Sequence, residues 1–253
     1  MTPRIYCSEA LSAGGSISLP QKQAHYLRSV LRREPGAALL LFNAESGEFA
    51  ARIAEIDKKG ARVELLDQTR APEAEPDIEL LLAPVKRAAM EMIVQKGTEL
   101  GVRRFRPVMT DRTNADRVRV DRLQAIALEA AEQCGRLSAP EVDAPASLAE
   151  TLLRWDVARA LYYCDEAGDD PAIRWGGPDG RAAPLLDVIS VEAKSAAILV
   201  GPEGGFSSDE RNWLRAIPHV TAATLGPRIL RADTAAIVAL ALWQARAGDL
   251  ARR

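Results

Sequence analysis

The sequence predicts an α/β protein whose mostly parallel sheet is preceded by a small β-barrel domain. After residue 78, apolar strands alternate with amphipathic helices, which is typical of a parallel sheet covered by helices on both faces. Before residue 70, the apolar stretches are short and separated by turn residues, as in small β-barrels. The segment between them is rich in proline and charge. We therefore expect a β-barrel domain over 1–70, a linker over 71–77 and an α/β domain over 78–253.

In the first domain, alternating apolar residues predict strands over 38–42, 49–56 and 61–66, because glycine, asparagine and aspartate separate them. Residues 25–33 predict a helix with one strongly basic side. In the second domain, the continuous apolar run 78–85 predicts a buried strand. The later elements are expected in this order: helix 86–100, strand 105–109, helix 121–133, strand 158–164, strand 196–200, a helix after Ser207, strand 220–225 and helix 235–247.

Polar residues mark the starts of three of these helices. Ser207 and Glu210 have the spacing of a capping box, in which each side chain bonds the other's backbone amide. Asp121 and Gln124 have the same spacing. Either Asp233 or Thr234 is expected to cap the last helix.

Two strands near the C-terminus each lead directly into a glycine–proline loop. Strand 196–200 is followed by Gly201-Pro202-Glu203-Gly204-Gly205-Phe206, and strand 220–225 by Gly226-Pro227-Arg228-Ile229-Leu230-Arg231. Ligands of α/β sheets bind beyond the carboxyl ends of the strands, where glycine lets the backbone approach them closely. One such loop alone is equally well a plain strand-to-helix connection. Two in succession predict a cofactor pocket.

Composition excludes several classes of function. The three cysteines and two histidines have no zinc-site spacing, so we expect no metal. No apolar run approaches the roughly 18 residues of a membrane span, and no signal-peptide core follows the N-terminus, so we expect a cytoplasmic protein. Neither a dinucleotide fingerprint nor a P-loop is present. The net charge of −2 argues against a protein that coats nucleic acid regardless of sequence. Residues 103–122, however, carry seven arginines against three aspartates. This run is interpreted either as a solvated face or as an RNA contact.

Five segments together resemble the RsmE branch of the SPOUT superfamily of RNA methyltransferases. They are 95–102, 111–113, 132–136, 199–206 and 225–231, and the resemblance covers nearly the whole chain. It implies a SPOUT-type sheet with a C-terminal trefoil knot, and a PUA-like fold for the first domain. It also implies methylation of N3 of a uridine in small-subunit (16S) ribosomal RNA, at position 1498, by a homodimer. The apolar circumference of helix 235–247 fits a dimer interface.

The implied cofactor is S-adenosylmethionine. By the resemblance, it is held by Leu199, Val200, Gly201, Pro202, Glu203, Gly204, Leu225, Gly226, Arg228, Ile229 and Leu230. Because the uracil imide is a weak acid, its anion needs a nearby cation and a base that removes the proton. Arg231 and Arg112 are the candidates for the cation, with Arg136 behind them, and Glu203 or Asp233 for the base. Asp233 stands where the family is expected to have glutamate, which favours a capping role for it.

RNA binding is assigned to basic residues of both domains. The candidates are Arg4, His25, Arg28, Arg32, Arg33, Arg112 and Arg136. Two alternatives stay open at this point. A related SPOUT enzyme methylates a ribose 2′-hydroxyl of transfer or ribosomal RNA with the same type of cofactor cleft. A non-catalytic RNA-binding assembly factor relies on the PUA-like domain alone, but has no use for paired glycine–proline loops.

Overall fold

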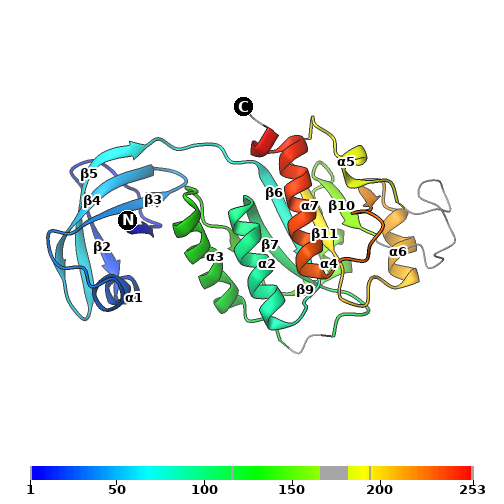
Figure 1. Cartoon of the computed structure of the whole chain (residues 1–253), viewed down its shortest axis with the longest axis horizontal. Helices are drawn as coiled ribbons and strands as arrows, with labels where there is room; N and C mark the ends of the chain where they lie inside the picture. The colour runs from blue at the N-terminus through cyan, green and yellow to red at the C-terminus, as the bar shows by residue number, and fades with distance from the viewer. Residues whose placement is uncertain (1, 115–116, 166–181, 194, 252–253) are drawn as a thin grey trace. The chain divides into compact units, whose positions relative to one another are not determined.

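The computed structural model describes residues 2–114, 117–165, 182–193 and 195–251. It forms two compact units (Figure 1). Unit 1 comprises residues 1–74 and 131–139, and unit 2 comprises residues 75–130 and 140–253. Residues 71–76, within the expected linker, have no regular secondary structure. Nothing in the sequence indicated that 131–139 would join the first unit, and the expected domain bounds remain a proposal.

Unit 1 is a curled five-stranded sheet with a short helical segment packed on it (Figure 1). Its strand order is β1-β3-β4-β5-β2, antiparallel except for the parallel pair β1 and β3. The apolar side chains that alternate along these strands form a core of their own around Leu41 and Val63. The elements are β1 (Arg4–Tyr6), β2 (Ser16–Pro20), α1 (Gln21–His25), η1 (Tyr26–Val30), β3 (Ala38–Asn43), β4 (Gly47–Ile56) and β5 (Gly60–Arg70).

The helix expected over 25–33 is displaced. It begins directly after Pro20, whose fixed φ suits a helix start, and its second half widens into a π-helix that ends at Val30. Arg32 then adopts a left-handed conformation with φ of +53°, so the chain turns away. Ala24 and Leu27 are fully buried against the sheet, and this packing decides where the helix lies. Arg32 and Arg33 consequently lie outside the helix.

Unit 2 is built on a seven-stranded sheet in which every described strand pair is parallel. Its order is β12-β10-β11-β6-β7-β8, with β9 beside β7. The predicted parallel α/β architecture is confirmed; the knot stays a prediction. The elements are β6 (Asp77–Leu82), α2 (Arg87–Glu99), β7 (Val102–Met109), α3 (Val120–Cys134), β8 (Glu141–Val142), β9 (Ala146–Ser147), α4 (Leu148–Leu153), β10 (Ala160–Cys164), α5 (Leu185–Val188), β11 (Ser195–Val200), α6 (Ser208–Arg215), β12 (Val220–Ala223), α7 (Ala232–Ala247) and η2 (Asp249–Ala251).

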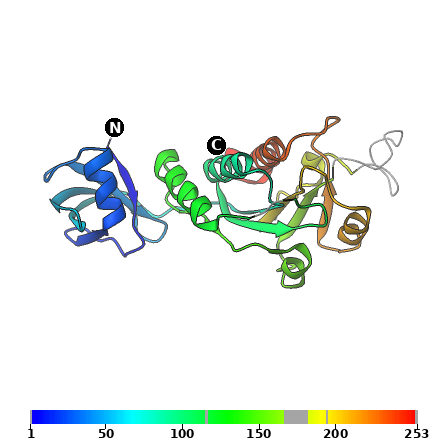
Figure 2. The ribbon, with the colours of Figure 1, turned by 90° about the horizontal axis from the view of Figure 1, so that it is seen from below.

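Helices cover both faces of this sheet. Figure 2 shows α2, α3 and α7 on one face and α4 and α6 on the other. Alternation along the strands fills both layers: in β11, Ile198 and Val200 face the α2 and α7 side, whereas Ala197 and Leu199 face the α4 and α6 side. Burial on both faces explains why the strands read as continuous apolar runs. Among the described residues, no helix has the length and apolarity needed to cross a membrane.

Segment 95–102, one of those that carry the resemblance, shapes the packing of α2. Gly97 lies against the ring of Phe105, and a Cβ there would approach it to 2.7 Å. Gly101 has a φ of +81° and ends the helix. Beside it, the buried amide of Gln244 from α7 donates to the carbonyl of Leu100 at 2.7 Å. These two glycines therefore let α2 pack closely on β7 and α7.

Segment 132–136 has a structural role in unit 1. The Arg4 guanidinium donates to the carbonyl oxygens of Ala131, Glu132 and Arg136 at 3.0–3.1 Å, and to that of Gly135 at 3.4 Å. It also pairs with Glu48 at 2.7 Å. Its N–H groups are thus used to hold this segment on the small sheet. We therefore assign Arg4 a structural role and do not include it among the proposed RNA contacts.

One of the three expected caps is confirmed. Ser207 and Glu210 form the complete capping box of α6. At α7, the cap prediction is wrong: the N-cap residue is Arg231, and Asp233 instead accepts from its neighbour Thr234 within the first turn. At α3, the Gln124 amide bonds Pro140 and Val142 and so secures β8, which replaces the expected box. Local spacing did not distinguish a cap from a tertiary contact in these cases.

Candidate functional site

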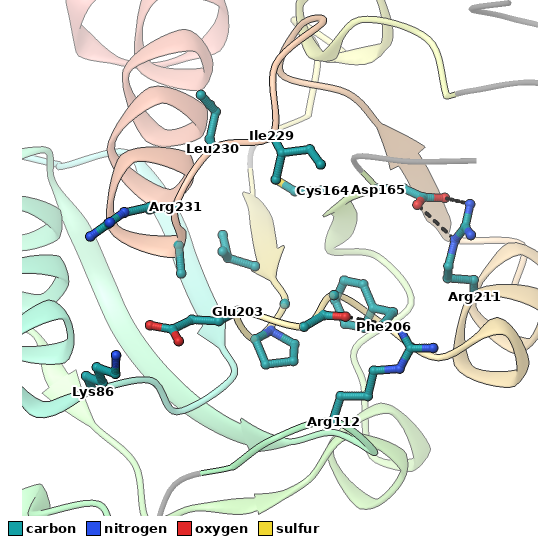
Figure 3. Close-up of a pocket in the computed structure, with 16 residues that line it drawn as sticks. Lys86, Arg112, Cys164, Asp165, Glu203, Phe206, Arg211, Ile229, Leu230 and Arg231 are labelled. Atoms are coloured by element: carbon teal, nitrogen blue, oxygen red, sulfur yellow. Dashed lines mark hydrogen bonds and ion pairs between the residues drawn. The ribbon is translucent and has the colours of Figure 1, made fainter. Parts of the chain in front are cut away.

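A pocket of about 520 Å³ opens at the carboxyl edge of the large sheet. Five strands supply its walls: Lys86 follows β6, Arg112 follows β7, Cys164 ends β10, the loop from Gly201 to Phe206 follows β11, and residues 229–232, after β12, lead into the first residue of α7 (Figure 3). Parallel strands place all their carboxyl ends at one edge, which is why segments so distant in sequence meet here. Its size suits a small organic ligand or cofactor.

The loop after β11 is shaped by its glycines. Gly205 has a φ of +68°, a conformation that other residues rarely adopt. Gly201 lies against the ring of Phe206, and a Cβ there would come within 2.9 Å of the ring. The ring is buried and makes an edge contact with Tyr163 at 5.8 Å between centroids, so it is held in place. Gly204 has only the Arg112 side chain near its missing Cβ, at 3.7 Å.

These contacts predict that two glycines of the same loop tolerate alanine differently. Gly201→Ala is expected to lower the free energy of unfolding by about 1–3 kcal/mol, because the added methyl group forces the packed Phe206 ring to shift. Gly204→Ala is expected to stay within about 0.5 kcal/mol of the wild type, since its Cβ makes ordinary contacts. Urea unfolding of both variants measures the difference. Equal stability of the two variants would show that the ring moves freely.

Arg112 is positioned by a tight turn that docks on the start of α6. Thr110 and Thr113 close the turn through backbone and hydroxyl hydrogen bonds. Asp111 accepts from the Ser207 hydroxyl at 2.6 Å and donates its backbone amide to Glu210 at 2.9 Å. The Arg112 guanidinium then donates to the Gly204 carbonyl at 3.0 Å. Segment 111–113 therefore joins the capping box to the glycine-rich loop.

Three charged side chains lie on the other side of the pocket. In Figure 3 the polar ends of Arg231, Glu203 and Lys86 are on the side opposite Arg112 and Phe206. All three side chains are exposed, so they can meet a ligand that enters from solvent. They come from three different loops, before α7, after β11 and after β6. The pocket thus offers one carboxylate between two cations.

A buried ionic network lies beside the part of the pocket that Cys164, Asp165 and Arg211 line. Asp165, only 4% exposed, pairs with Arg211 at 3.0 Å and with Arg215 at 2.7 Å. The Tyr163 hydroxyl donates to Asp165 at 3.1 Å and accepts from Arg215 at 3.1 Å. Burial, followed by the nearby Asp165 charge, raises the pKa of Tyr163 to about 12. This network ties α6 to the end of β10.

The raised pKa predicts a loss of stability at alkaline pH. Because the folded state holds the Tyr163 proton more tightly than the unfolded chain, its stabilising contribution is full below pH 10 and is lost as pH rises toward about 12. We expect the free energy of unfolding to decline over that window, with a smaller decline in Tyr163→Phe. Unfolding measured at several alkaline pH values tests this. Identical pH profiles for the two proteins would exclude Tyr163 as the source.

The structure brings most of the expected cofactor and catalytic residues together, but not all. Those that line the pocket are Val200, Gly201, Pro202, Glu203, Gly204, Ile229, Leu230, Arg231 and Arg112. Leu199, Leu225, Gly226, Arg228 and Asp233 do not line it. Leu199 faces the α4 and α6 core, because neighbouring residues of a strand point to opposite faces. Leu225 packs beside the core on the α7 side.

Sequence reasoning missed several lining residues. They are Lys86, Cys164, Asp165, Gly205, Phe206, Arg211 and Ala232. Lys86 and Asp165 directly follow the predicted strands 78–85 and 158–164, so the rule that ligands bind beyond strand ends would have found both. Arg211 lies inside α6 and reaches the pocket only through tertiary packing. The part of the chain that the structure describes contains no group of three or more potential metal-ligating side chains.

The other expected RNA-binding residues lie in unit 1. His25 and Arg28 line a surface hollow of about 440 Å³ together with Lys22 and Lys58. Arg32 and Arg33 do not line it. Arg136 is partly buried and donates to the Ser138 hydroxyl at 2.7 Å. Of the expected basic residues of this region, His25 and Arg28 therefore share one hollow, whereas Arg32 and Arg33 do not.

The fold and the site agree with comparisons to known proteins. The RNA methyltransferase domain family matches residues 72–244, and the RNA methyltransferase PUA domain family matches residues 19–66. Ribosomal RNA small subunit methyltransferase E of Rickettsia conorii is 30% identical over 239 residues, which cover 94% of this chain and 93% of that protein. The enzyme of the same name from Neisseria gonorrhoeae, solved bound to S-adenosyl methionine, has a TM-score of 0.83 at 30% identity and covers 98% of this chain and 99% of its own. A methyltransferase from Legionella pneumophila, solved with the cofactor SAM, has a TM-score of 0.80 at 30% identity and covers 97% and 98%.

Proposed function

The chain belongs to the ribosomal RNA small subunit methyltransferase E family, and we propose that it methylates N3 of a uridine in 16S ribosomal RNA. The general reaction, methylation of ribosomal RNA with S-adenosylmethionine, follows from membership of the family. The choice of uracil N3 and of position 1498 goes further and is our proposal. The observation that carries it is the pocket at the carboxyl edge, where the glycine-rich loop carries the Glu203 carboxylate and the cations Arg231 and Arg112 line the pocket on opposite sides.

The pocket residues fit S-adenosylmethionine. Backbone groups of the loop from Gly201 to Gly205 face the space with few side chains of their own, which suits hydrogen bonds to an adenine edge. Val200 and Leu230 offer apolar surface for packing against the base. A volume of about 520 Å³ is within the range of cofactor sites. When bound, the cofactor would supply an activated methyl group, and the electron pair of the sulfur–methyl bond that breaks would stay on sulfur.

The chain's own residues then have two tasks, to hold the uracil and to manage one proton. The Glu203 carboxylate accepts the proton from N3, so that the nitrogen lone pair is free to form the new N–C bond. Arg231 and Arg112 stabilise the negative charge that develops on the two uracil oxygens. Asp233 is the weaker candidate for the base, because its carboxylate is engaged by Thr234 and does not line the pocket.

The hollow in unit 1 supports RNA binding by the PUA-like domain. Lys22, His25, Arg28 and Lys58 line it, with Asp57 as the acidic member. Hydrogen bonds from the backbone amides of Lys59 and Gly60 lower the pKa of Asp57, so it stays ionised and limits the local positive charge. We assign this hollow to sequence-independent phosphate contacts.

The reaction is tested by mapping ribosomal RNA from cells that lack the gene. A methyl group on uracil N3 blocks the base-pairing edge, so reverse transcription stops at the site in wild-type RNA and reads through in the mutant RNA. Adding the purified protein and S-adenosylmethionine to mutant small subunits should restore the stop. A methyl group on a ribose oxygen instead would contradict the N3 assignment. No methyl transfer at all would leave only a binding role.

A second copy of the chain is proposed to pack along α7. Ala236, Ala239 and Trp243 are buried within unit 2, yet Ile237 and Val238 on another side are only half-buried and lie outside the core cluster. Apolar side chains left partly exposed in this way fit a homodimer interface. Sedimentation at micromolar concentration should give a dimer, and Val238→Arg should give a monomer. A fully active wild-type monomer would disprove the dimer proposal.

A further inference from the structure

A basic groove lies next to the cofactor pocket on unit 2. It has a volume of about 380 Å³ and is formed by the start of α2, the segment before α3 and the first turn of α3. Met90 and Leu123 provide apolar surface within it. Lys86 lines both this groove and the cofactor pocket, so the two hollows are neighbours that share this residue. Arg117, Arg119 and Arg122 belong to the arginine run over 103–122, for which the sequence left a solvated face and an RNA contact open.

The charges along the groove are strongly one-sided. Of the described residues that line it, five are cationic, namely Lys86, Arg87, Arg117, Arg119 and Arg122, and one, Glu91, is a carboxylate. This excess stands out in a chain whose net charge is −2. No side chain caps the start of α2, and its first turn contains no acidic residue, so Glu91 is the one carboxylate among the described lining residues that offsets the cations.

The ion pairs in the groove can give way to a phosphate. Glu91 accepts from Arg87 at 2.8 Å and from Arg122 at 3.4 Å, and these arginines lower its pKa and keep it ionised. Arg119 pairs with Asp121 at 3.1 Å, and both side chains are more than half exposed. Solvent-exposed pairs such as Arg119–Asp121 contribute little to stability, so a phosphate can replace the carboxylate partner at little cost.

A second charged cluster of unit 2, around Arg106 and Arg159, differs from the groove in its balance of charges. Arg106 is mostly buried and pairs with Glu79 at 2.5 Å and Asp143 at 3.1 Å. Arg159 pairs with the same Glu79 at 3.5 Å and with Asp77 at 2.7 Å. There, three carboxylates balance the two arginines. The described lining of the groove instead has one carboxylate for five cations.

We propose that this groove binds the phosphate backbone of the RNA strand adjoining the target nucleotide. The proposal rests on the proposed function, since the occupant is taken to be the RNA that enters the neighbouring pocket. Phosphates of a single strand complement the excess of cations, and the apolar patch formed by Met90 and Leu123 suits an unstacked base. Lys86, at the junction, lies where the strand passes from the groove to the pocket.

The test compares two double variants of equal charge change. Arg119→Ala with Arg122→Ala removes two groove cations, and Arg103→Ala with Arg154→Ala removes two exposed arginines that do not line the groove. The probe is small ribosomal subunits from cells lacking the gene, with filter binding at several salt concentrations. The groove variant should bind about tenfold more weakly, with a salt slope lower by about two, whereas the control variant should bind as the wild type does.

Two further readouts separate this proposal from the proposed function. Calorimetry should show unchanged S-adenosylmethionine affinity in both double variants, which also establishes that they fold. Methylation by the groove variant should show a raised KM for the subunits and an unchanged kcat. Equal binding by the groove and control variants would overturn the groove proposal even if the wild type methylates RNA. A wild type that binds the subunits through the groove but transfers no methyl group would overturn the proposed function instead.

Discussion

Replacing Arg231 with alanine is expected to lower the rate of methyl transfer by about 10²–10³-fold and to leave the affinities for cofactor and RNA nearly unchanged. Arg231 is the N-cap residue of α7 and its exposed side chain borders the pocket on the side of Glu203 (Figure 3). In the proposed reaction its guanidinium stabilises charge that exists fully only in the transition state. Removing such a group affects turnover far more than binding. Single-turnover methylation and calorimetry measure the two effects separately.

Arg228→Ala is the matched control for this experiment. Arg228 is exposed and lies three residues earlier in the same loop, but it does not line the pocket. Its removal changes the charge by the same amount and is expected to leave the rate within about twofold of the wild type. A normal rate for Arg231→Ala, or equal losses in both variants, would remove Arg231 from the mechanism.

Replacing Asp165 with alanine is expected to lower the free energy of unfolding of unit 2 by about 3–5 kcal/mol. The substitution leaves Arg211, which is 8% exposed, beside a second arginine without the carboxylate that both contact. A buried charge that loses a carboxylate partner is among the most destabilising changes in proteins. Urea unfolding followed by circular dichroism gives the loss. The pocket should lose cofactor affinity as well, since α6 is no longer tied to β10.

The control is Asp121→Ala. It removes an exposed aspartate whose ion pair with an arginine is about as long as that between Asp165 and Arg211. Asp121 pairs with Arg119 at 3.1 Å, and both side chains are well solvated. We expect almost no change in the free energy of unfolding, because exposed ion pairs contribute little. A double variant, Asp165→Ala with Arg211→Met, should recover part of the loss, because it removes one of the two arginines whose charge Asp165 offsets. Similar stabilities for Asp165→Ala and Asp121→Ala would show that water reaches Arg211.

The two glycine–proline loops illustrate how far sequence reasoning reached into the site. The sequence predicts both loops at strand ends, and parallel strands must present those ends at one edge, so a pocket there followed from local patterns alone. The assignment of single residues was less complete. Val200 lines the pocket while Leu199 packs in the core, and this depends on the orientation of each side chain in β11. Lys86 and Asp165 complete the site from strands whose neighbours in the sheet are far away in sequence.

The sequence by itself determined the fold class, the order of the main elements and the family. These depend on local periodicity, on turn residues and on short motifs that need no knowledge of distant contacts. The tertiary structure decided which residues act together. It assigned Arg4 to the packing of 131–136, moved the helix start from residue 25 to Gln21 and placed Arg119 and Arg122 beside Lys86 in one groove. Each of these results depends on packing between segments tens of residues apart, whose free energy no local pattern expresses.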